Sequence, residues 1–222
     1  MNPDNNALER TYFIGGPPRV GKSILACAFA EKIHGNVVST DSIRDAVKKA
    51  CTDKDSDLFA VNAVQDMPEE EWVRVHKETP EVIVAYQNRE SEALWPSLVA
   101  FCNNFCEDEM NHIIEGIGIL PKLVAGMQHR PKHVVFVGNT STEHLYAMMD
   151  YAKKFPEKDW MSAMQYSEER FKGMAHYIRE MSLYLRNEAN THGFAYHEIS
   201  DAHFEESIQE IIRAIIIQSS DD

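Results

Sequence analysis

Gly16-Pro17-Pro18-Arg19-Val20-Gly21-Lys22-Ser23 is a complete copy of the pattern G-x-x-x-x-G-K-S/T. A short strand-like run, Tyr12-Phe13-Ile14, precedes it, and a helix-forming run from Ile24 to Ala30 follows it. A strand, a glycine-containing loop and a helix in this order form the setting in which the pattern binds nucleotide phosphates. The alternative, a chance glycine turn before a helix, is much weaker because every fixed position is present.

Each fixed position of this stretch has a chemical role. Backbone N–H groups of the loop point at phosphate oxygens, and the new helix adds its positive N-terminal end. Pro17 and Pro18 have no N–H group, so most amides must come from residues 19–23. Lys22 reaches the β- and γ-phosphates, and the Ser23 hydroxyl is placed for Mg²⁺. The residues expected to bind the nucleotide are Gly16, Arg19, Val20, Gly21, Lys22 and Ser23.

Apolar runs of strand length recur along the chain and alternate with helical stretches. They are Thr11–Gly15, Asn36–Ser39, His112–Glu115, His133–Val137 and Ala195–Ile199. Such alternation predicts an α/β fold with a five-stranded parallel sheet covered by helices on both faces, a three-layer arrangement. The length of 222 residues is enough for one such domain. Functional groups are then expected at the carboxyl ends of the strands.

Two helical regions interrupt this alternation. Residues 41–106 are expected to form a helical insert on the substrate side, with Pro68 opening one helix and Pro96 kinking or breaking another that starts near Pro80. Residues 139–190 are expected to form a lid and a long helix from about Ser162 to Asn190. An apolar stripe on that helix, and an isoleucine-rich face on a last helix from Phe204 to Ile217, should pack within the chain. Either stripe would also suit a homodimer contact.

The composition narrows the classes of partner. The formal net charge is −13 and the chain has no basic tract, so nucleic acid, which needs a cationic surface, is disfavoured. No apolar run approaches the roughly 18 residues of a membrane span. The first six residues are polar and do not resemble a signal peptide. The four cysteines show no metal-binding spacing, and reduced thiols in a cytoplasmic protein are the expectation.

Asp41 and Arg44 form the first candidate pair outside the loop. Asp41 follows the second predicted strand, and Arg44 faces the same way three residues later on a helix. A carboxylate beside the phosphates can accept the proton of an attacking hydroxyl, and an arginine can hold an anionic group of the acceptor. The alternative is a helix N-cap at Asp41 and a solvated Arg44.

Glu115 is the second candidate outside the loop. It ends the apolar run His112-Ile113-Ile114-Glu115 and is followed by Gly116 and Gly118. In phosphate-binding-loop proteins, an acid at the end of a neighbouring strand commonly holds Mg²⁺ or its water. Ser23 and Glu115 are therefore the expected metal-binding residues. The alternative is a strand-terminal acid before an ordinary turn.

These residues resemble those of a known group of enzymes. The stretch from Val38 to Arg44, the run Ile113-Ile114-Glu115-Gly116 and the later Pro121 are similar to 2-phosphoglycerate kinase and, more broadly, to small phosphate-loop kinases of the adenylate-kinase-like and zeta-toxin type. The resemblance covers about the first half of the chain. It implies ATP and Mg²⁺ as the donor and a small, anionic molecule with a hydroxyl as the acceptor. It also implies that Asp41 is the base and Arg44 the acceptor anchor.

The chain departs from that group in its lid. Such kinases usually carry several lid arginines that act on the transferring phosphate, and no tight arginine pair is present here. The available cations include Arg170, Arg179 and Arg186. Arg170 is the one that we expect to join Lys22, Asp41 and Arg44 as a catalytic residue, although each of the three also fits an ordinary surface charge.

Three other functions remain open on the sequence. A nucleotide-dependent switch or regulator would bind ATP or GTP and move the helical lid without a small-molecule acceptor. A degenerate kinase would bind a metabolite without reaction, but intact Lys22, Ser23 and Asp41 argue against it. A kinase of nucleic-acid ends conflicts with the acidic charge.

Overall fold

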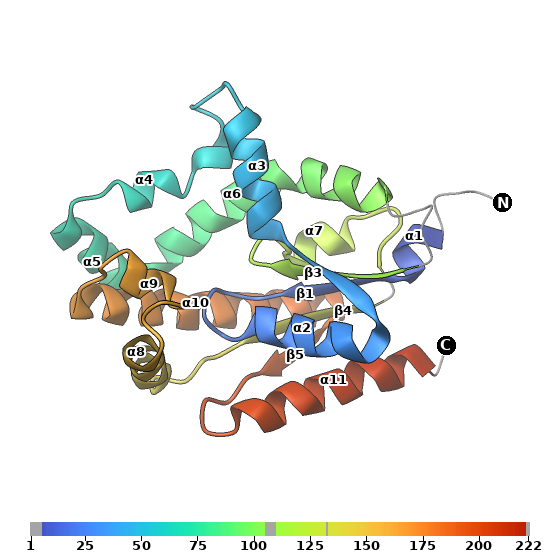
Figure 1. Cartoon of the computed structure of the whole chain (residues 1–222). Coiled ribbons are helices and arrows are strands. Elements are labelled where there is room, and N and C mark those ends of the chain that lie inside the picture. Colours follow the sequence, from blue (N-terminus) through green and yellow to red (C-terminus); the bar gives the residue numbers. More distant parts are fainter. Residues whose placement is uncertain (1–5, 105–109, 132, 221–222) are drawn as a thin grey trace.

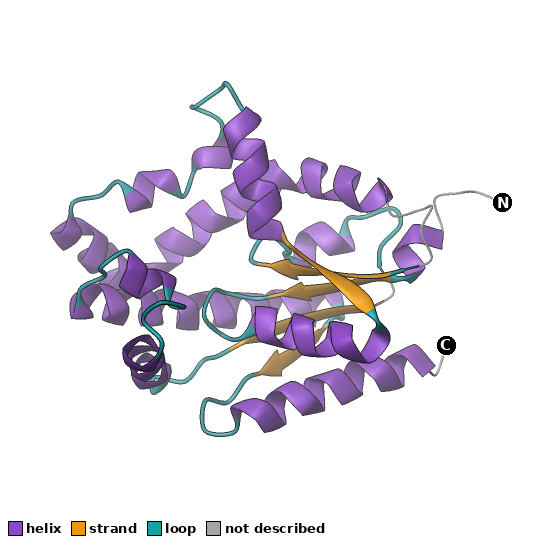
Figure 2. Ribbon diagram, in the orientation of Figure 1, coloured by secondary structure: helices purple, strands orange, loops and turns teal. Residues whose placement is uncertain are grey.

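The chain folds around a parallel sheet in the computed structural model, which describes residues 6–104, 110–131 and 133–220. The strands are β1 (Thr11–Gly15), β2 (Gly35–Ser39), β3 (Asn111–Gly116), β4 (His133–Gly138) and β5 (Ala195–Glu198). Their order is β2-β3-β1-β4-β5, with every neighbouring pair parallel (Figure 2). The prediction of five parallel strands at these positions is confirmed.

Helices cover both faces of this sheet (Figure 1). On one face, α2 (Lys22–Ile33) packs against β1, β2 and β3, and α11 (Phe204–Ser220) packs against β4 and α2. On the other face, α10 (Glu168–His192) contacts β4, β5 and α7 (Pro121–Ala125). A short helix, α1 (Asn6–Glu9), precedes β1. This is the three-layer arrangement that a sheet buried on both faces requires.

The core lies between the sheet and these helices. Ile14, Ile113, Ile114 and Phe136 of the central strands are fully buried. The apolar stripe of α10 is buried as expected, at Phe171, Met174, Ile178, Met181 and Leu185. On α11 the isoleucines up to Ile215 are buried, whereas Ile216 is partly exposed and Ile217 more so. The stripes therefore pack within the chain.

The region from Thr40 to Cys102 is helical, as predicted. It contains α3 (Thr40–Ala50), the 3₁₀ turn η2 (Asp57–Phe59), α4 (Asn62–Gln65), α5 (Glu69–Glu78) and α6 (Pro80–Cys102). Of the kink or break expected at Pro96, the break was wrong, because α6 continues through this residue. Proline removes one helical hydrogen bond, but Leu94 and Leu98 on either side are buried and hold the helix against the core. Residues 105 and 106 of the predicted insert lie outside the described residues.

The second helical region is divided more finely than predicted. It consists of α8 (His144–Lys154), α9 (Trp160–Ala163) and α10. The long helix begins at Glu168 rather than near Ser162, because Ser167 caps it and Gln165 before it has a positive φ of 55°. A positive φ cannot continue a right-handed helix. Gly193 ends α10 in the left-handed conformation, as predicted.

The strand register brings the predicted site residues to one edge of the sheet. Gly15 pairs with Gly116, and Ser39 pairs with Glu115. Gly116 has a φ of 150°, and a Cβ there would lie 1.8 Å from the Thr40 hydroxyl oxygen. Only glycine allows this approach, so the end of β3 and the start of α3 meet with no side chain from residue 116 between them.

No helix in the described ranges is long and apolar enough to cross a membrane. Cys27, Cys51 and Cys102 are free thiols, and Cys106 lies outside the described residues.

We expect Gly116→Ala to lower the free energy of unfolding by about 3 kcal/mol, because the added methyl group overlaps Thr40 and the backbone is strained. Urea denaturation measures this. Gly126→Ala is the matched control, since a Cβ there meets nothing closer than 3.5 Å. Equal stabilities of the two variants would contradict the Gly116–Thr40 contact.

Candidate functional site

Residues 16–21 connect β1 to α2, and Lys22 and Ser23 are the first two residues of α2. Gly16 lies so close to β4 that a Cβ would be 2.5 Å from the Val137 carbonyl oxygen. Gly21 has a φ of 94° and directly precedes α2. The Val20 side chain is buried in the core. Lys22 Nζ donates a hydrogen bond of 2.7 Å to the Pro17 carbonyl oxygen, so the lysine points back over its own loop.

Arg19 ties this loop to the segment between α8 and α10. Its φ is +67°, which is uncommon for a residue with a side chain. Its guanidinium forms an ion pair with buried Asp159, donates to the Met148 carbonyl oxygen at 3.3 Å and lies over the Tyr151 ring. Asp159 also caps α9 through the Ser162 N–H. The side chain of Arg19 is therefore held by α8 and by the residue before α9, whereas its backbone remains part of the loop.

Ser23 and Glu115 are brought together as the sequence suggested. The Ser23 hydroxyl donates a hydrogen bond of 3.2 Å to Glu115 Oε1. Burial lowers the pKa of Lys22, and the nearby charges of Glu115 and Asp41 oppose this shift. No group of three or more His, Cys, Asp or Glu side chains with metal-binding geometry occurs among the described residues. A hydroxyl and one carboxylate fit Mg²⁺, which keeps several waters and takes phosphate oxygens as ligands.

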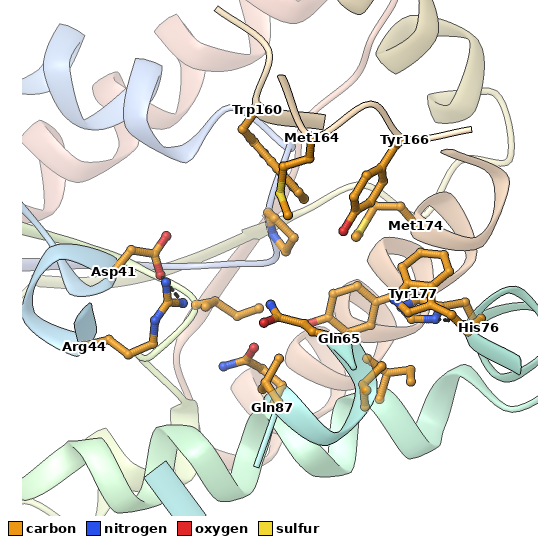
Figure 3. A pocket seen from close by; sticks show the side chains of 16 residues that line it. Asp41, Arg44, Gln65, His76, Gln87, Trp160, Met164, Tyr166, Met174 and Tyr177 are labelled. Atoms are coloured by element: carbon orange, nitrogen blue, oxygen red, sulfur yellow. Dashed lines mark hydrogen bonds and ion pairs between the residues drawn. The ribbon is translucent and has the colours of Figure 1, made fainter. Parts of the chain in front are cut away.

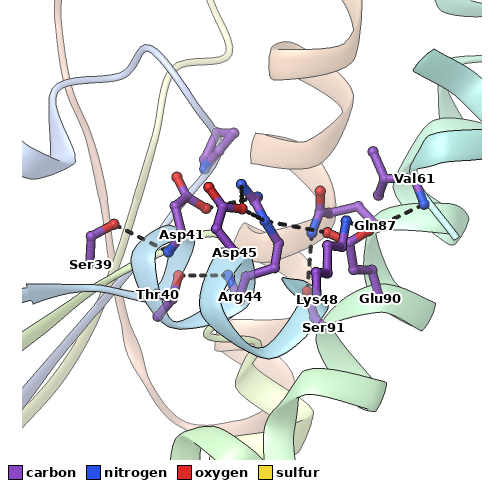
Figure 4. A network of polar contacts seen from close by, with 12 residues as sticks. Ser39, Thr40, Asp41, Arg44, Asp45, Lys48, Val61, Gln87, Glu90 and Ser91 are labelled. Atoms are coloured by element: carbon purple, nitrogen blue, oxygen red, sulfur yellow. Dashed lines mark hydrogen bonds and ion pairs between the residues drawn. The ribbon is translucent and has the colours of Figure 1, made fainter. Parts of the chain in front are cut away.

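Asp41 and Arg44 form an ion pair of 3.0 Å on the first turns of α3. The N-cap of this helix is Ser39, whose hydroxyl accepts from the Asp41 N–H at 3.2 Å. The alternative role of Asp41 as the cap was therefore wrong. Arg44 is not a solvated surface charge either, because it also pairs with Asp45 at 2.9 Å and lies 3.8 Å from Glu90 (Figure 4).

The charges around Arg44 form one network with α6. Glu90 is buried and accepts from Lys48 at 2.7 Å and from the Val61 N–H at 3.3 Å. Burial lowers the pKa of Arg44, but Asp41, Asp45 and Glu90 outweigh this and raise it above its ordinary value. The network thus holds two cations and three carboxylates. The positive charge of the Arg44 guanidinium is therefore balanced by carboxylates of the protein itself.

A pocket of about 350 Å³ begins at Asp41 and at Pro18 of the loop (Figure 3). It lies between α3, α4, α5 and α6 on one side and α9 and α10 on the other. Its apolar and aromatic lining is Val61, Val64, Trp72, Ile83, Ile117, Trp160, Met164, Tyr166, Met174 and Tyr177. The remaining side chains are Arg44, Gln65, His76 and Gln87. The candidate base therefore stands at one end of a largely apolar pocket.

Several polar groups of this pocket are uncharged. Burial raises the pKa of Tyr177, with Glu90 and Asp41 adding to the shift, so its hydroxyl stays protonated near pH 7. Burial also raises the pKa of Tyr166 against the opposing charge of Arg170. Gln87 is buried and donates from Nε2 to Ser91 at 3.3 Å, which leaves its carbonyl oxygen for a ligand.

Arg170 lies beside this pocket, behind its aromatic wall. The guanidinium carbon is 5.2 Å from the Trp72 ring centroid and 5.1 Å from that of Tyr166. Its Nε is buried without a hydrogen-bond partner among the described residues. In the described part of the chain, no hydrogen bond or ion pair joins Arg170 to the Gly16–Ser23 loop.

The sequence reasoning missed other residues at the candidate site. Asp159 lies 140 positions from its partner Arg19, and no local pattern marks it. Gln87 and Glu90 could have been found, because both occupy positions of the buried stripe of α6, where a polar side chain needs a reason. Arg89, on the same helix, pairs with Asp57 and does not line the pocket.

His76, in the wall of the pocket, makes the stability of the folded protein depend on pH. It is 2% exposed and stacks on Trp72, and its Nδ1 donates to the Trp72 carbonyl oxygen at 2.8 Å. Burial lowers the pKa of His76 from 6.5 to about 4. In the unfolded chain His76 binds a proton near pH 6.5, whereas in the folded chain it binds one only near pH 4. Stability is therefore lost as the pH falls through this window.

We expect this histidine to account for about 3 kcal/mol of the stability lost between pH 6.5 and 4. His76→Phe keeps the ring stack and should flatten the pH profile of the free energy of unfolding over this range. Phe155→Leu, at an exposed aromatic position without a titratable group, should leave the shape of the profile unchanged. Parallel profiles for His76→Phe and the unmodified protein would contradict the prediction.

No family model matches the chain, and a search of curated proteins found no match.

Proposed function

We propose that this protein is a kinase that transfers the γ-phosphoryl group of ATP, with Mg²⁺, to a hydroxyl of a small molecule. The observation that carries the proposal is the convergence of Lys22, Ser23, Glu115 and Asp41 at one edge of the sheet, next to a pocket that starts at Asp41. The fold we infer is that of the phosphate-loop NTPases, with the adenylate-kinase-like kinases as the nearest type. The free thiols fit a reducing, cytoplasmic location.

The nucleotide is assigned to the Gly16–Ser23 loop. Amides of residues 19–23 and the first turn of α2 hold the phosphates. Lys22 gives up its hydrogen bond to the Pro17 carbonyl oxygen and donates to the β- and γ-phosphates instead. The low pKa that burial imposes on Lys22 rises again beside phosphate, because opposite charge favours the ammonium form.

Ser23 and Glu115 are the residues assigned to Mg²⁺ or its water. When bound, the metal supplies charge stabilisation to the β- and γ-phosphate oxygens. The chain's own contribution is to fix the direction of the two oxygen groups, since the hydroxyl and the carboxylate already lie 3.2 Å apart.

Asp41 is assigned to the acceptor hydroxyl. It orients this group toward the γ-phosphorus and accepts its proton. Arg44 holds the Asp41 carboxylate at 3.0 Å and thereby fixes its direction. Arg170 stays the proposed lid cation, and it must leave the aromatic wall to reach a phosphate. The catalytic effect comes from positioning and charge, which together supply on the order of 10 kcal/mol.

The link between Arg19 and Asp159 favours one second candidate, a nucleotide-dependent switch. A nucleotide that reshapes the loop would move α9 through this ion pair. Such a protein would hydrolyse ATP slowly, no hydroxyl compound would stimulate it, and it would bind another protein in one nucleotide state only.

We expect Asp41→Asn to lower turnover by at least about 100-fold and to leave ATP affinity nearly unchanged, because it removes the proton acceptor but no phosphate contact. Asp45→Asn is the matched control, since Asp45 also pairs with Arg44 but does not line the pocket. Lys22→Ala should weaken ATP binding as well as turnover. ATP consumption with a panel of acceptors, 2-phosphoglycerate included, and ATP titration by calorimetry measure these effects. Unchanged turnover in Asp41→Asn would remove Asp41 from the mechanism.

A further inference from the structure

We propose that the acceptor is an uncharged, planar ring compound with a hydroxyl, of the size of a nucleoside, bound in the pocket between Asp41 and Tyr166. This rests on the proposed kinase function and departs from the small anionic acceptor that the resemblance implies. The pocket described above provides four independent observations for it: its charge, its aromatic wall, its amides and its volume.

The charge of the pocket does not suit an anion. Among the residues that the structure describes, Asp41 and Arg44 are the only Asp, Glu, Lys or Arg side chains that line it. Arg44 is already held by three carboxylates, and Lys48 behind it is held by Glu90. The lowered pKa of His76 keeps its imidazole neutral near pH 7. A phosphate or carboxylate group placed here would face Asp41 without a free cation, which is costly in a partly buried site.

The wall opposite Arg44 suits a flat apolar ring. Trp160 and Tyr166 meet edge to face with centroids 5.6 Å apart, and Met164 and Met174 lie beside them (Figure 3). Trp160 is 40% exposed and Met164 is 62% exposed, although both line the pocket. The exposure of Trp160 at a pocket is unusual for so large an apolar side chain. A bound ring would cover it, and aromatic and thioether groups both favour ring contacts.

The amides suit a ring with its own donors and acceptors. The Gln65 and Gln87 side chains lie between the Asp41–Arg44 pair and Tyr177 (Figure 3). Among the described residues, the Gln65 side chain forms no hydrogen bond, although its backbone N–H donates to the Val61 carbonyl oxygen, and the Gln87 side chain uses only its Nε2 end. With the protonated Tyr166 and Tyr177 hydroxyls, they can pair with the polar edge of a heteroaromatic ring.

The volume suits a single nucleoside-sized molecule. About 350 Å³ is near the lower end of the range for small-molecule sites. Asp41 stands at one end of the pocket (Figure 3) and Pro18 of the Gly16–Ser23 loop also lines it, so a hydroxyl attached to the ring would be directed toward the transferring phosphate.

Binding and turnover test the inference separately. Adenosine, guanosine, cytidine, uridine, 2-phosphoglycerate and glucose are titrated by calorimetry into the full chain saturated with a non-hydrolysable ATP analogue and Mg²⁺, which blocks the nucleotide site. The same compounds are then tested as phosphoryl acceptors with ATP. Gln65→Ala and Trp160→Ala probe the pocket. Their matched controls are Gln209→Ala on α11 and Tyr146→Ala on α8, both exposed and outside the pocket. Thermal melting checks that each variant is folded.

We expect at least one nucleoside to bind and to be phosphorylated. The KM for it should rise about 5-fold in Gln65→Ala and about 10-fold or more in Trp160→Ala, from the loss of a hydrogen bond and of ring stacking. The two controls should be unchanged. Phosphorylation of 2-phosphoglycerate without binding of any nucleoside would overturn the inference and uphold the kinase. Nucleoside binding without turnover of any compound would uphold the pocket chemistry and overturn the kinase. Absence of both would overturn both proposals.

Discussion

The close approach of Gly116 to Thr40 sets the geometry on which the candidate site depends. A Cβ at residue 116 would overlap the Thr40 hydroxyl, so the backbone of Gly116 at the end of β3 packs directly against the Thr40 side chain at the start of α3. One residue before Gly116 stands Glu115, and one residue after Thr40 stands Asp41. Both carboxylates therefore lie near Lys22 and act on its pKa. A wider gap between the two strand ends would separate the groups assigned to metal and acceptor.

Some charged side chains at this site are buried away from water, and each is stabilised by a nearby hydrogen-bond partner. Lys22 is buried with the Pro17 carbonyl oxygen as its hydrogen-bond partner. Glu90 is buried with Lys48 and a backbone N–H. Breaking such a pair leaves an uncompensated charge, which costs about 3–5 kcal/mol. Arg44 is likewise paired with Asp41, Asp45 and Glu90, so its charge is not available to a further anion. The ion pairs that stabilise this network therefore also limit which molecules the neighbouring pocket can bind.

The Gly16–Ser23 loop and the pocket are also linked through the start of α9. Arg19 in the loop pairs with Asp159, and the next residue, Trp160, lines the pocket. Two neighbouring residues at the start of α9 thus contact the Gly16–Ser23 loop and line the pocket. A motion of α9 would alter both the loop conformation, which is held at a positive φ at Arg19, and the aromatic wall. Through this contact, a ligand bound in the pocket can change the conformation of the Gly16–Ser23 loop, and a ligand bound to the loop can change the pocket wall.

The sequence by itself determined the five parallel strands, the loop and helix of the Gly16–Ser23 stretch, and the placement of Asp41 and Arg44 on the same side of α3. These follow from short-range patterns of apolar residues, glycines and helical spacing. Local breakers were less reliable: Pro96 did not end its helix, because packing of its neighbours outweighed one lost hydrogen bond. Only the tertiary structure decided that Asp159 meets Arg19, that Glu90 reaches Arg44, and that Gln87 faces a pocket. Those contacts join segments far apart in the chain, and no local preference encodes which side chains packing will bring together.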